Sequence, residues 1–500
     1  MDLLLQSFVD LVAFWPLFYV TIGVGAGIIF GAIPGLNGGI LLALVLPLTF
    51  NMDTTHSIVL LVSIYTGGVS GGLISGTLIG VPGSPAALMT TFDAFPMARK
   101  GHPARALSLG IVASFVGGLI SWLFLAFLSP PLTRIALKFS EFEIFSMVMM
   151  GIVLIGSVSA GSLAKGLFSG ALGMLIATVG WDEVTGESRM TMGFQDLAVG
   201  FELLPVFLGL FAVTQMLSDV QDVDKPRDLI HTTFAEVMKS IGGMKTHIGN
   251  YIRSAIIGTW IGILPGIGAS AGSIIAYTAA KKASKKPEDF GQGSEEGIVA
   301  SETANNATIG GALIPMITLG IPGSVADVIL LAALILHSVV PGPLLMLNNP
   351  DVFYGIISSA LLANIIMFVI MISTAAYIGR IIDIHQMFLI PIVLFLCVMG
   401  IFLVSSNPFN LFVLLGFGVL GLVLKFFGIP TAPFVIGYIL EPVAEESLRI
   451  GLMLSDGSFA PLFTRPLSAV FLAIAFGFLV WSPLKNSLRA HKLRRESVGS

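Results

Sequence analysis

Charged residues and cysteine are scarce in this 500-residue sequence. Only 11% of the residues are charged and 55% are hydrophobic, whereas soluble domains have about 25% charged residues. The single cysteine, Cys397, lies in an apolar run, which excludes a disulfide framework and any cysteine-based metal or redox site. The N-terminus lacks the basic stretch of a signal peptide and contains Asp2 and Asp10, which favours a first membrane segment over a cleaved leader. The composition is that of an integral membrane protein.

Motifs of several enzyme classes are also missing. No Gly-x-x-x-x-Gly-Lys-Ser/Thr loop occurs, which excludes ATP hydrolysis by that route, and no residue cluster has the spacing of a metal enzyme. GVSG at 68–71 matches the Gly-x-Ser-Gly of intramembrane serine proteases, but none of the seven histidines is an evident partner for Ser70. We therefore expect a protein that is not an enzyme and needs no cofactor, with the serine protease as a remote alternative.

Long apolar stretches predict the fold class. Barrel-type alternation is absent, so helices are expected to satisfy the backbone inside lipid. We expect an all-α polytopic membrane protein with about 12 transmembrane segments, some of them broken or re-entrant. Stretches long enough, or nearly so, to cross a hydrocarbon core of about 30 Å occur at 107–130, 144–180, 353–379, 386–404 and 467–482.

Two pairs of similar segments indicate an internal repeat. GGLISGTLIGVPGSPA (71–86) and GALIPMITLGIPGSVA (311–326) agree at eight of sixteen positions. Upstream, GIIFGAIPG (27–35) resembles GTWIGILPG (258–266). The two pairs occur in the same order, which favours a duplication, as in many transporters, over coincidence between glycine-rich helices.

A polar connector at 218–250 separates a predicted first membrane half, 1–217, from a second half with a C-terminal tail, 251–500. Apolar residues at helical spacing in the connector predict an amphipathic helix in the membrane interface, with a short cytosolic helix as the alternative. These residues are Ile230, Phe234, Val237, Ile241 and Met244.

Basic residues fall at opposite positions in the two halves. The turn at 51–56 has no Lys or Arg, whereas its counterpart in the second half has four lysines within 281–286. Farther on, the first half has three basic residues within 99–105, and the second has none from 287 to 379. Because basic loops stay in the cytoplasm, the halves are predicted to be inverted-topology repeats. The basic C-terminal tail is predicted to be cytoplasmic.

Each half contains two Pro-Gly breaks in apolar segments. Backbone groups freed by such breaks are tolerated in lipid only where they are buried in protein or line a wet cavity. A helix that restarts there presents free N–H groups and about half a positive charge, which suits an anion. We predict that the breaks form a carboxylate site near the bilayer midplane, with kinks for close helix packing as the alternative. The breaks lie at Pro34-Gly35, Pro82-Gly83-Ser84, Pro265-Gly266 and Pro322-Gly323-Ser324.

The segment SETANNATIGG at 301–311 carries polar residues inside an apolar run. A carboxylate within the bilayer usually faces a cavity or a partner, so Glu302 and Thr308 are predicted to bind the coupling cation, sodium or a proton. A Glu302 at the membrane interface is the alternative. Asp93 and Asp327 follow the breaks at unequal spacing and are weaker candidates. The predicted substrate-binding residues are Pro34, Gly35, Asn37, Gly83, Ser84, Gly266, Ser270, Asn305, Asn306, Gly323 and Ser324.

Late in the chain, the stretch at 441–457 concentrates acidic residues with one arginine. We expect a salt-bridged loop at the membrane edge, with a docking or gating element as the alternative. The charged residues are Glu441, Glu445, Glu446, Arg449 and Asp456.

Several motifs together resemble the large membrane subunit of the tripartite tricarboxylate transporters, over nearly the whole chain. They are GVPGSPAALMTTFDAFPMARKGHPARAL, GIPGSVAD, AIPGLNGG, LPGIGAS, EEGIVASETANNATIGGALIPMITLGIPGS and VIGYILEPVAEESLR. The resemblance implies a multi-pass permease of the bacterial inner membrane. It implies a small membrane subunit and a periplasmic solute-binding protein as partners, and uptake of citrate-like or other carboxylates coupled to a cation gradient. The motifs do not select one carboxylate, and nothing points to nucleic acid.

The energetics of an anionic cargo also favour coupling. A trianion that enters a cell against 100 mV costs about 7 kcal/mol, and without ATP this cost must be offset by co-transported cations. We therefore expect cation symport with alternating access. A passive anion channel is the alternative, although no filter-like signature is present.

Overall fold

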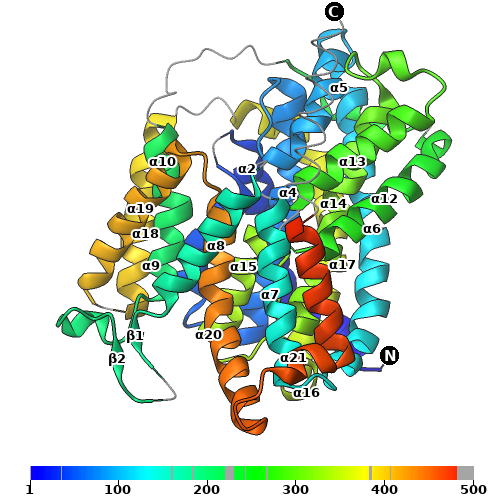
Figure 1. Cartoon of the computed structure of the whole chain (residues 1–500). Helices are drawn as coiled ribbons and strands as arrows, with labels where there is room; N and C mark the ends of the chain where they lie inside the picture. Colours follow the sequence, from blue (N-terminus) through cyan, green and yellow to red (C-terminus); the bar gives the residue numbers. More distant parts are fainter. Residues whose placement is uncertain are drawn as a thin grey trace, which may run out of the picture. The chain divides into compact units, whose positions relative to one another are not determined.

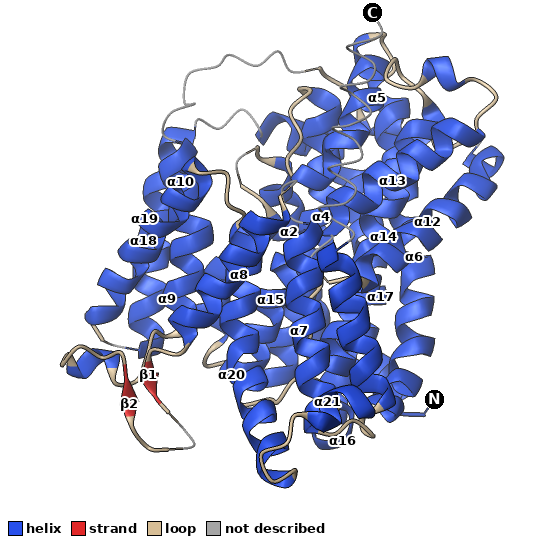
Figure 2. Cartoon of the chain, in the orientation of Figure 1, coloured by secondary structure: helices blue, strands red, loops and turns tan. Residues whose placement is uncertain are grey.

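The computed structural model describes most of the chain and contains mainly helices (Figure 1; Figure 2). Its two strands, β1 (Gly180–Trp181) and β2 (Ser188–Arg189), pair antiparallel. The residues outside the description are 1, 35, 159–161, 183–184, 220–229, 243, 266–267, 382–385, 406 and 481–500. The predicted cytoplasmic tail therefore lies outside the described residues.

The chain forms two compact units, each of which takes segments from both sides of the connector. The first unit comprises Met1–Ala136 and Leu203–Leu420, and the second comprises Leu137–Glu202 and Gly421–Ser500. The division into sequence halves at 218–250 stays a prediction, because these units group residues by packing.

The first unit contains most of the long helices. Its helices are α1 (Asp2–Leu11), α2 (Phe14–Ala32), α3 (Gly38–Val45), η1 (Leu46–Thr49), α4 (Thr54–Leu78), η2 (Pro85–Ala87), α5 (Leu88–Arg99), α6 (Pro103–Ala136), α9 (Leu203–Phe207), η5 (Leu208–Val213), α10 (Thr214–Asp219), α11 (Phe234–Lys239), η7 (Met244–His247), α12 (Ile248–Ile263), α13 (Gly268–Ala283), η8 (Pro287–Asp289), α14 (Glu295–Leu319), α15 (Val325–Leu336), α16 (Leu345–Asn348), α17 (Pro350–Ile381), α18 (Gln386–Ser405) and most of α19 (Phe409–Phe426).

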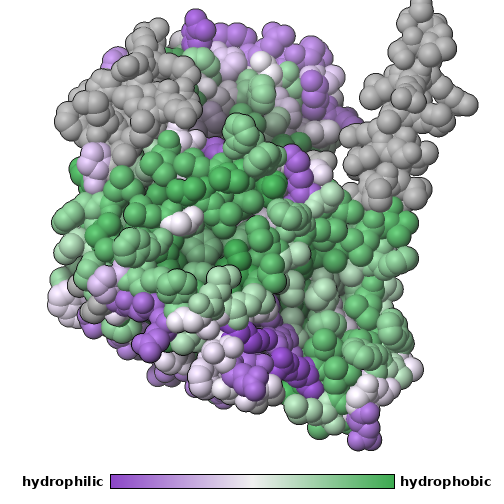
Figure 3. All heavy atoms as spheres, turned by 60° about the vertical axis from the view of Figure 1, so that its left-hand side comes forward, coloured by the Kyte–Doolittle hydropathy of each residue, from purple (hydrophilic) through white to green (hydrophobic). Residues whose placement is uncertain are grey.

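Five described helices, α2, α4, α6, α17 and α19, are long and apolar enough to cross a membrane. Shorter apolar helices accompany them, among them α8 (Leu163–Ala177) and α15. On the face shown in Figure 3, hydrophobic side chains cover a broad area, and hydrophilic side chains gather toward its upper and lower ends. The prediction of an all-α, multi-pass membrane protein is confirmed, whereas the number of about 12 spans stays a prediction.

Glycines bring α2 and α4 into backbone contact. A Cβ atom on Gly27 would overlap the carbonyl oxygen of Ile64. A Cβ atom on Gly31 would likewise overlap the carbonyl oxygen of Gly68. Only glycine permits an approach this close, so the glycine-rich sequence here determines how the helices pack.

The same kind of contact joins α12 and α14. A Cβ atom on Gly258 would overlap the carbonyl oxygen of Ala304, and one on Gly262 would lie 2.5 Å from that of Thr308. These residues are spaced from their counterparts in α2 and α4 just as the repeated sequence segments are. The two helix pairs thus use equivalent residues for equivalent contacts.

The segments α4–α5 and α14–α15 run in opposite directions. Asp93 in α5 accepts hydrogen bonds from three backbone N–H groups within 291–294, at 2.8–2.9 Å, so α5 ends beside the start of α14. His337, which follows α15, lies 3.4 Å from the hydroxyl of Thr49, which precedes α4. The end of α15 is therefore beside the start of α4, and α4 and α14 are antiparallel.

The described part of the connector contains a short helix, α11, of six residues. Thr233 and Glu236 form a capping box at its start, and the backbone N–H of Thr233 holds the pKa of Glu236 below its usual range. Val237 is fully buried, and its carbonyl accepts a hydrogen bond from Ser108 in α6 at 2.8 Å. Helix α11 is thus shorter than the predicted amphipathic helix, and it buries Val237 beside α6. Its place in the membrane interface stays a prediction.

The second unit is built around α20 (Thr431–Leu454), which packs on α7 (Glu141–Val158) and α8. A Cβ atom on Gly437 would overlap the carbonyl oxygen of Gly170, so α20 and α8 also meet through glycine. The remaining described elements include η4 (Gln195–Leu197), α21 (Ala460–Thr464) and an apolar helix at Pro466–Val480.

The predicted loop at 441–457 is mostly helix, because its first fourteen residues belong to α20. Arg449 pairs with Asp182 at 3.1 Å and with Glu445 at 2.6 Å. Arg189 of β2 pairs with Glu445 at 2.8 Å. The predicted salt bridges are present, but the loop prediction is wrong, because opposite charges four residues apart favour a helix.

Candidate functional site

The two Pro-Gly-Ser breaks begin with a glycine in the same backbone conformation. Gly80 follows α4 and Gly320 follows α14, and both have a φ of 72°. This left-handed conformation favours glycine and ends a helix. Ser84 then precedes η2, and Ser324 caps α15. The predicted interruptions after α4 and α14 are therefore present at equivalent residues.

Within each half, the downstream break packs onto the upstream one. A Cβ atom on Gly83 would overlap the carbonyl oxygen of Gly31. A Cβ atom on Gly323 would lie 2.9 Å from the carbonyl oxygen of Gly262. Gly35 and Gly266 themselves lie outside the described residues. Each half therefore brings its interrupted backbone segments together.

The serines at the two breaks have different surroundings. The hydroxyl of Ser84 is buried and has no hydrogen-bond partner among the described residues, and the first turn of α5 has no acidic residue. The hydroxyl of Ser324 instead donates to Asp327 at 2.6 Å and lies 3.1 Å from the hydroxyl of Tyr65. A carboxylate of the chain itself already lies at the start of α15, so the two helix starts are not equivalent anion sites.

The two serines are also separated along α4. Ser324 contacts Tyr65, whereas a Cβ atom on Gly72 would lie 3.0 Å from the hydroxyl of Ser84. Seven residues, about 10.5 Å of helix, separate Tyr65 from Gly72. The breaks instead pair across the halves, since α3 packs near α15 and α13 packs near η2. The helix starts thus form two groups along α4, and they do not meet at one point.

Glu302 lies at the centre of a buried polar network. Its side chain is fully buried, and Oε1 accepts a hydrogen bond from Thr90 of α5 at 2.7 Å. Oε2 accepts hydrogen bonds from Ser114 of α6 at 3.1 Å and from Asn306 at 3.3 Å. Asn305 lies 3.5 Å from the same oxygen. The carboxylate therefore joins α14 to the helices that follow the first-half break.

Asn306 connects this network to α4. Its Oδ1 accepts a hydrogen bond from Ser70 at 2.6 Å. Ser70, the residue of the protease-like motif, thus belongs to a packing contact between α4 and α14. The Oδ1 of Asn305 is buried, and no described residue donates a hydrogen bond to it. Leaving a buried acceptor unpaired is costly, so Asn305 is a candidate ligand for a bound species.

The network holds a buried carboxylate without a basic partner. Among the described residues, no Lys, Arg or His forms an ion pair with Glu302. All of its hydrogen-bond partners are neutral donors. An uncompensated buried charge is strongly unfavourable, so this site is suited to receiving a proton or another cation.

Other predicted residues have local structural contacts. Asn37 caps α3 by accepting a hydrogen bond from the backbone N–H of Ile40 at 3.0 Å. Thr308 donates to the carbonyl of Asn305 at 2.6 Å and, six residues after Glu302, lies on a different face of α14. Ser270 lies half-buried in the first turn of α13. Pro34 precedes α3, within the break.

The sequence analysis did not identify two residues that donate hydrogen bonds to Glu302. Thr90 and Ser114 belong to α5 and α6, far from Glu302 in the sequence. Thr90 has a weak signal, because it is a polar residue shortly after a Pro-Gly-Ser break. Ser114 has none, since a serine in a membrane helix is ordinarily a packing residue.

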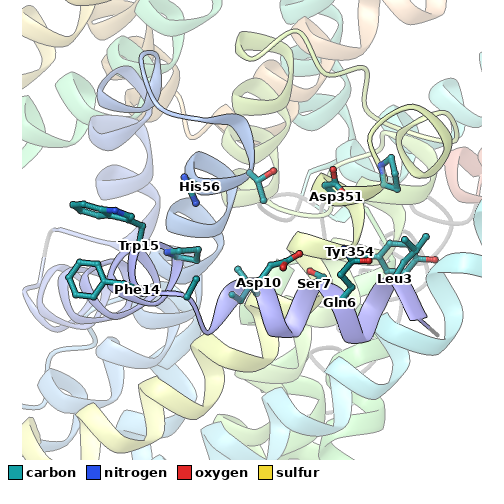
Figure 4. A pocket seen from close by; sticks show the side chains of 14 residues that line it. Leu3, Gln6, Ser7, Asp10, Phe14, Trp15, His56, Asp351 and Tyr354 are labelled. Carbon is teal, nitrogen blue, oxygen red and sulfur yellow. The ribbon is translucent and has the colours of Figure 1, made fainter.

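A separate cavity of about 430 Å³ lies among α1 and the starts of α2, α4 and α17 (Figure 4). Its polar lining includes Gln6, Asp10, His56 and Asp351. None of the predicted site residues lines it. His56 is about 21 Å along α4 from the Ser70 position, so this cavity is distinct from the Glu302 network.

Comparison with known proteins gives the family. The model of the tripartite tricarboxylate transporter TctA family matches residues 17–436. An uncharacterized 52.8 kDa protein of the TAR-I ttuC' 3' region of Agrobacterium vitis is 33% identical over 92% of this chain and 91% of its own length. An uncharacterized protein of the TAR-II ttuC' 3' region of the same organism is 32% identical over 43% of this chain and 90% of its own length. The chain belongs to the tripartite tricarboxylate transporter TctA family.

Proposed function

We propose that this chain is the large membrane subunit of a secondary transporter that imports a carboxylate together with a cation. It would work with a small membrane subunit and a periplasmic solute-binding protein in the bacterial inner membrane, with its C-terminus in the cytoplasm. Family membership supports tricarboxylate transport by a system of several components. Coupling, alternating access and receptor dependence are our inferences.

The observation that carries the proposed coupling is the fully buried Glu302 without a basic partner. Its four neutral donors suit a carboxylate that exchanges a proton or a sodium ion as the transporter cycles. Because Thr90 and Ser114 belong to helices that follow the first-half break, a change in the charge of Glu302 would alter contacts between elements of both halves. This links cation binding to helix movement.

For the carboxylate, the best-supported position is the break that includes Gly83 and Ser84. The Ser84 hydroxyl has no hydrogen-bond partner among the residues that the structure describes, and nearby backbone N–H groups at the restart of the helix favour an anion. Asn305 offers a further unpartnered group. The start of α15 is less suitable, because Asp327 already lies there.

Alternating access is supported by the antiparallel arrangement of α4–α5 and α14–α15. Helices α5 and α6 pack on α14, while α15 and α17 pack on α4. We infer that the halves are inverted-topology repeats that exchange helices across a pseudo-twofold axis, an arrangement that lets each half open toward one side of the membrane.

The direct test is carboxylate uptake into proteoliposomes that contain this chain, its small subunit and the loaded solute-binding protein. Sodium and proton gradients are imposed separately and together. Accumulation above the external concentration with one of the gradients supports symport and identifies the cation. Uptake that stops at equal concentrations under every gradient would instead support a passive anion channel.

A further inference from the structure

A second, smaller cavity lies between α4, α6, α14 and α17 in the first unit. Its volume is about 10 Å³, close to the minimum that holds one water-sized particle, about 10–15 Å³. It borders the Glu302 network through one shared side chain, that of Asn306. The polar residues that line it are Thr66, Ser121, Trp122, Asn306 and Asn364.

The lining offers oxygen lone pairs more than hydrogen-bond donors. Asn306 gives its amide group to Glu302, at 3.2 Å to the carbonyl oxygen and 3.3 Å to Oε2. The other four polar side chains already donate to backbone carbonyls, at 3.0, 3.1, 2.9 and 2.9 Å, respectively, from Thr66, Ser121, Trp122 and Asn364. The oxygen atoms of the hydroxyl and amide groups can still accept.

Asn364 carries a buried acceptor that is suited to a ligand in the cavity. Its side chain is 2% exposed, and its Oδ1 has no hydrogen-bond partner in the described part of the chain. The orientation of the amide is fixed, because its nitrogen donates to the carbonyl of Phe115 at 2.9 Å and a flipped amide would place two acceptors together. A buried acceptor without a partner is costly, unless something in the cavity binds it.

Two glycines make room for these polar groups. A Cβ atom on Gly118 would overlap the amide of Asn364. A Cβ atom on Gly310 would lie 2.6 Å from the hydroxyl oxygen of Ser121. The space beside both side chains therefore depends on the absence of a methyl group from two different helices, α6 and α14.

We infer that this cavity binds one sodium ion through oxygen atoms of Thr66, Ser121, Asn306 and Asn364. Hard cations prefer oxygen ligands, and the shortage of donors disfavours a carboxylate. The charge of Glu302, one hydrogen bond away through Asn306, offsets that of the ion. Use of this ion to drive uptake rests on the proposed function, but its binding does not.

The test is equilibrium binding of radioactive sodium to the purified full chain in detergent, without carboxylate, partner subunit or gradient. We expect saturable binding that lithium weakens and choline leaves unchanged. Asn364→Leu, which removes the unpartnered oxygen at similar size, should weaken binding at least tenfold. Ser358→Ala is the matched control, because Ser358 is a fully buried residue of α17 whose unpartnered hydroxyl does not line the cavity.

Thr66→Val provides a second variant of nearly unchanged shape, in case Asn364→Leu does not fold, and it should also weaken sodium binding severalfold. Absence of saturable binding in the wild type would overturn the inference, since the cavity would then hold water alone. Equal sodium affinity of folded Asn364→Leu or Thr66→Val and the wild type would overturn it as well.

A third variant separates this inference from the proposed function. If Glu302→Gln abolishes sodium binding while Asn364→Leu retains it, the ion lies at Glu302. The cavity assignment is then wrong, and symport still stands. If sodium binds as inferred but no gradient drives uptake, the cavity assignment stands and the proposed symport fails.

Discussion

At single positions, the space for a Cβ atom distinguishes the glycines that helix packing requires from those that it does not. On α2, a Cβ atom on Gly31 would overlap the carbonyl oxygen of Gly68, whereas one on Gly25 meets nothing within 4 Å. We expect Gly31→Ala to lower the free energy of unfolding by about 1–3 kcal/mol through overpacking. Gly25→Ala should be neutral or stabilising by up to about 1 kcal/mol. Thermal unfolding of both variants in detergent tests this, and equal stability would contradict it.

The two break serines should respond differently to the same substitution. Ser84→Ala removes an unpartnered hydroxyl, so we expect an increased KM for carboxylate uptake and unchanged thermal stability. Ser324→Ala removes the cap of α15, which should cost about 1 kcal/mol of stability. Uptake kinetics and unfolding measured on the same preparations test both expectations. An unchanged KM in Ser84→Ala would remove the proposed role of Ser84.

For individual side chains, the sequence predicts which residues lie close together only when they belong to the same helix. The spacing of Glu302, Asn305 and Asn306 places them on nearly one face of α14, and in the structure both asparagines donate to the Glu302 carboxylate. Thr90 and Ser114 reach Glu302 from other helices, and no local pattern encodes such a contact. The oxygen of Asn37 caps α3, and because asparagine before a helix can serve as a cap or as a ligand, its role in substrate binding stays a prediction.

Among the elements, Arg105 of α6 connects three helices. It donates to Glu295 of α14 at 2.8 Å, and to the carbonyls of Ser240 and Gly242, which follow α11, at 2.7 Å each. We expect Arg105→Ala to accelerate hydrogen exchange in residues 234–242, because α11 is short and α6 would no longer hold its end. Mass spectrometry of exchanged peptides measures this change.

The matched control for Arg105 is Arg99→Ala. Arg99 is a nearby arginine of the first half whose guanidinium lies over the ring of Phe95, 5.8 Å from its centre. Its removal eliminates a charge without cutting the bonds to α11. Similar exchange rates for 234–242 in the two variants would show that loss of charge alone, and not the Arg105 contacts, controls α11.

Element boundaries were predictable where glycine and proline end a helix. The interruptions after α4 and α14 follow from Gly80 and Gly320, which adopt a conformation that disfavours other residues. The helix through 441–454 was not predicted, because its charges suggested a loop although they pair with Asp182 and Arg189 across the second unit. The pair between Glu445 and Arg449, four residues apart, was a local signal for a helix, whereas the pairs with Asp182 and Arg189 could not be predicted from the sequence.

For the whole molecule, the proposed inverted arrangement predicts which loops face each side of the membrane. In a Cys397→Ala background, Asn51→Cys should react with an impermeant maleimide added to intact spheroplasts. Lys285→Cys, in the basic loop after α13, should react only after the membrane is permeabilised. Both positions are exposed. Reaction of both cysteines from outside would contradict inverted halves.

The sequence indicated the family, the membrane class and the repeated segments, but not the grouping of helices into units. The units separate residues 137–202 from the rest of the predicted first half. Packing between elements far apart in the chain, such as α7 and α8 against α20, determines that grouping. Similarity between repeat segments carries no information about it.

The proposal that Glu302 couples cation binding to carboxylate movement can be tested by replacing its carboxylate. Glu302→Gln is reconstituted with its partners and assayed for gradient-driven accumulation and for exchange of labelled carboxylate across the membrane. Glu296→Gln, the same change six residues earlier in α14, is the control. We expect Glu302→Gln to exchange carboxylate but not accumulate it, and Glu296→Gln to do both. Full gradient-driven accumulation by Glu302→Gln would show that Glu302 does not couple cation binding to carboxylate movement.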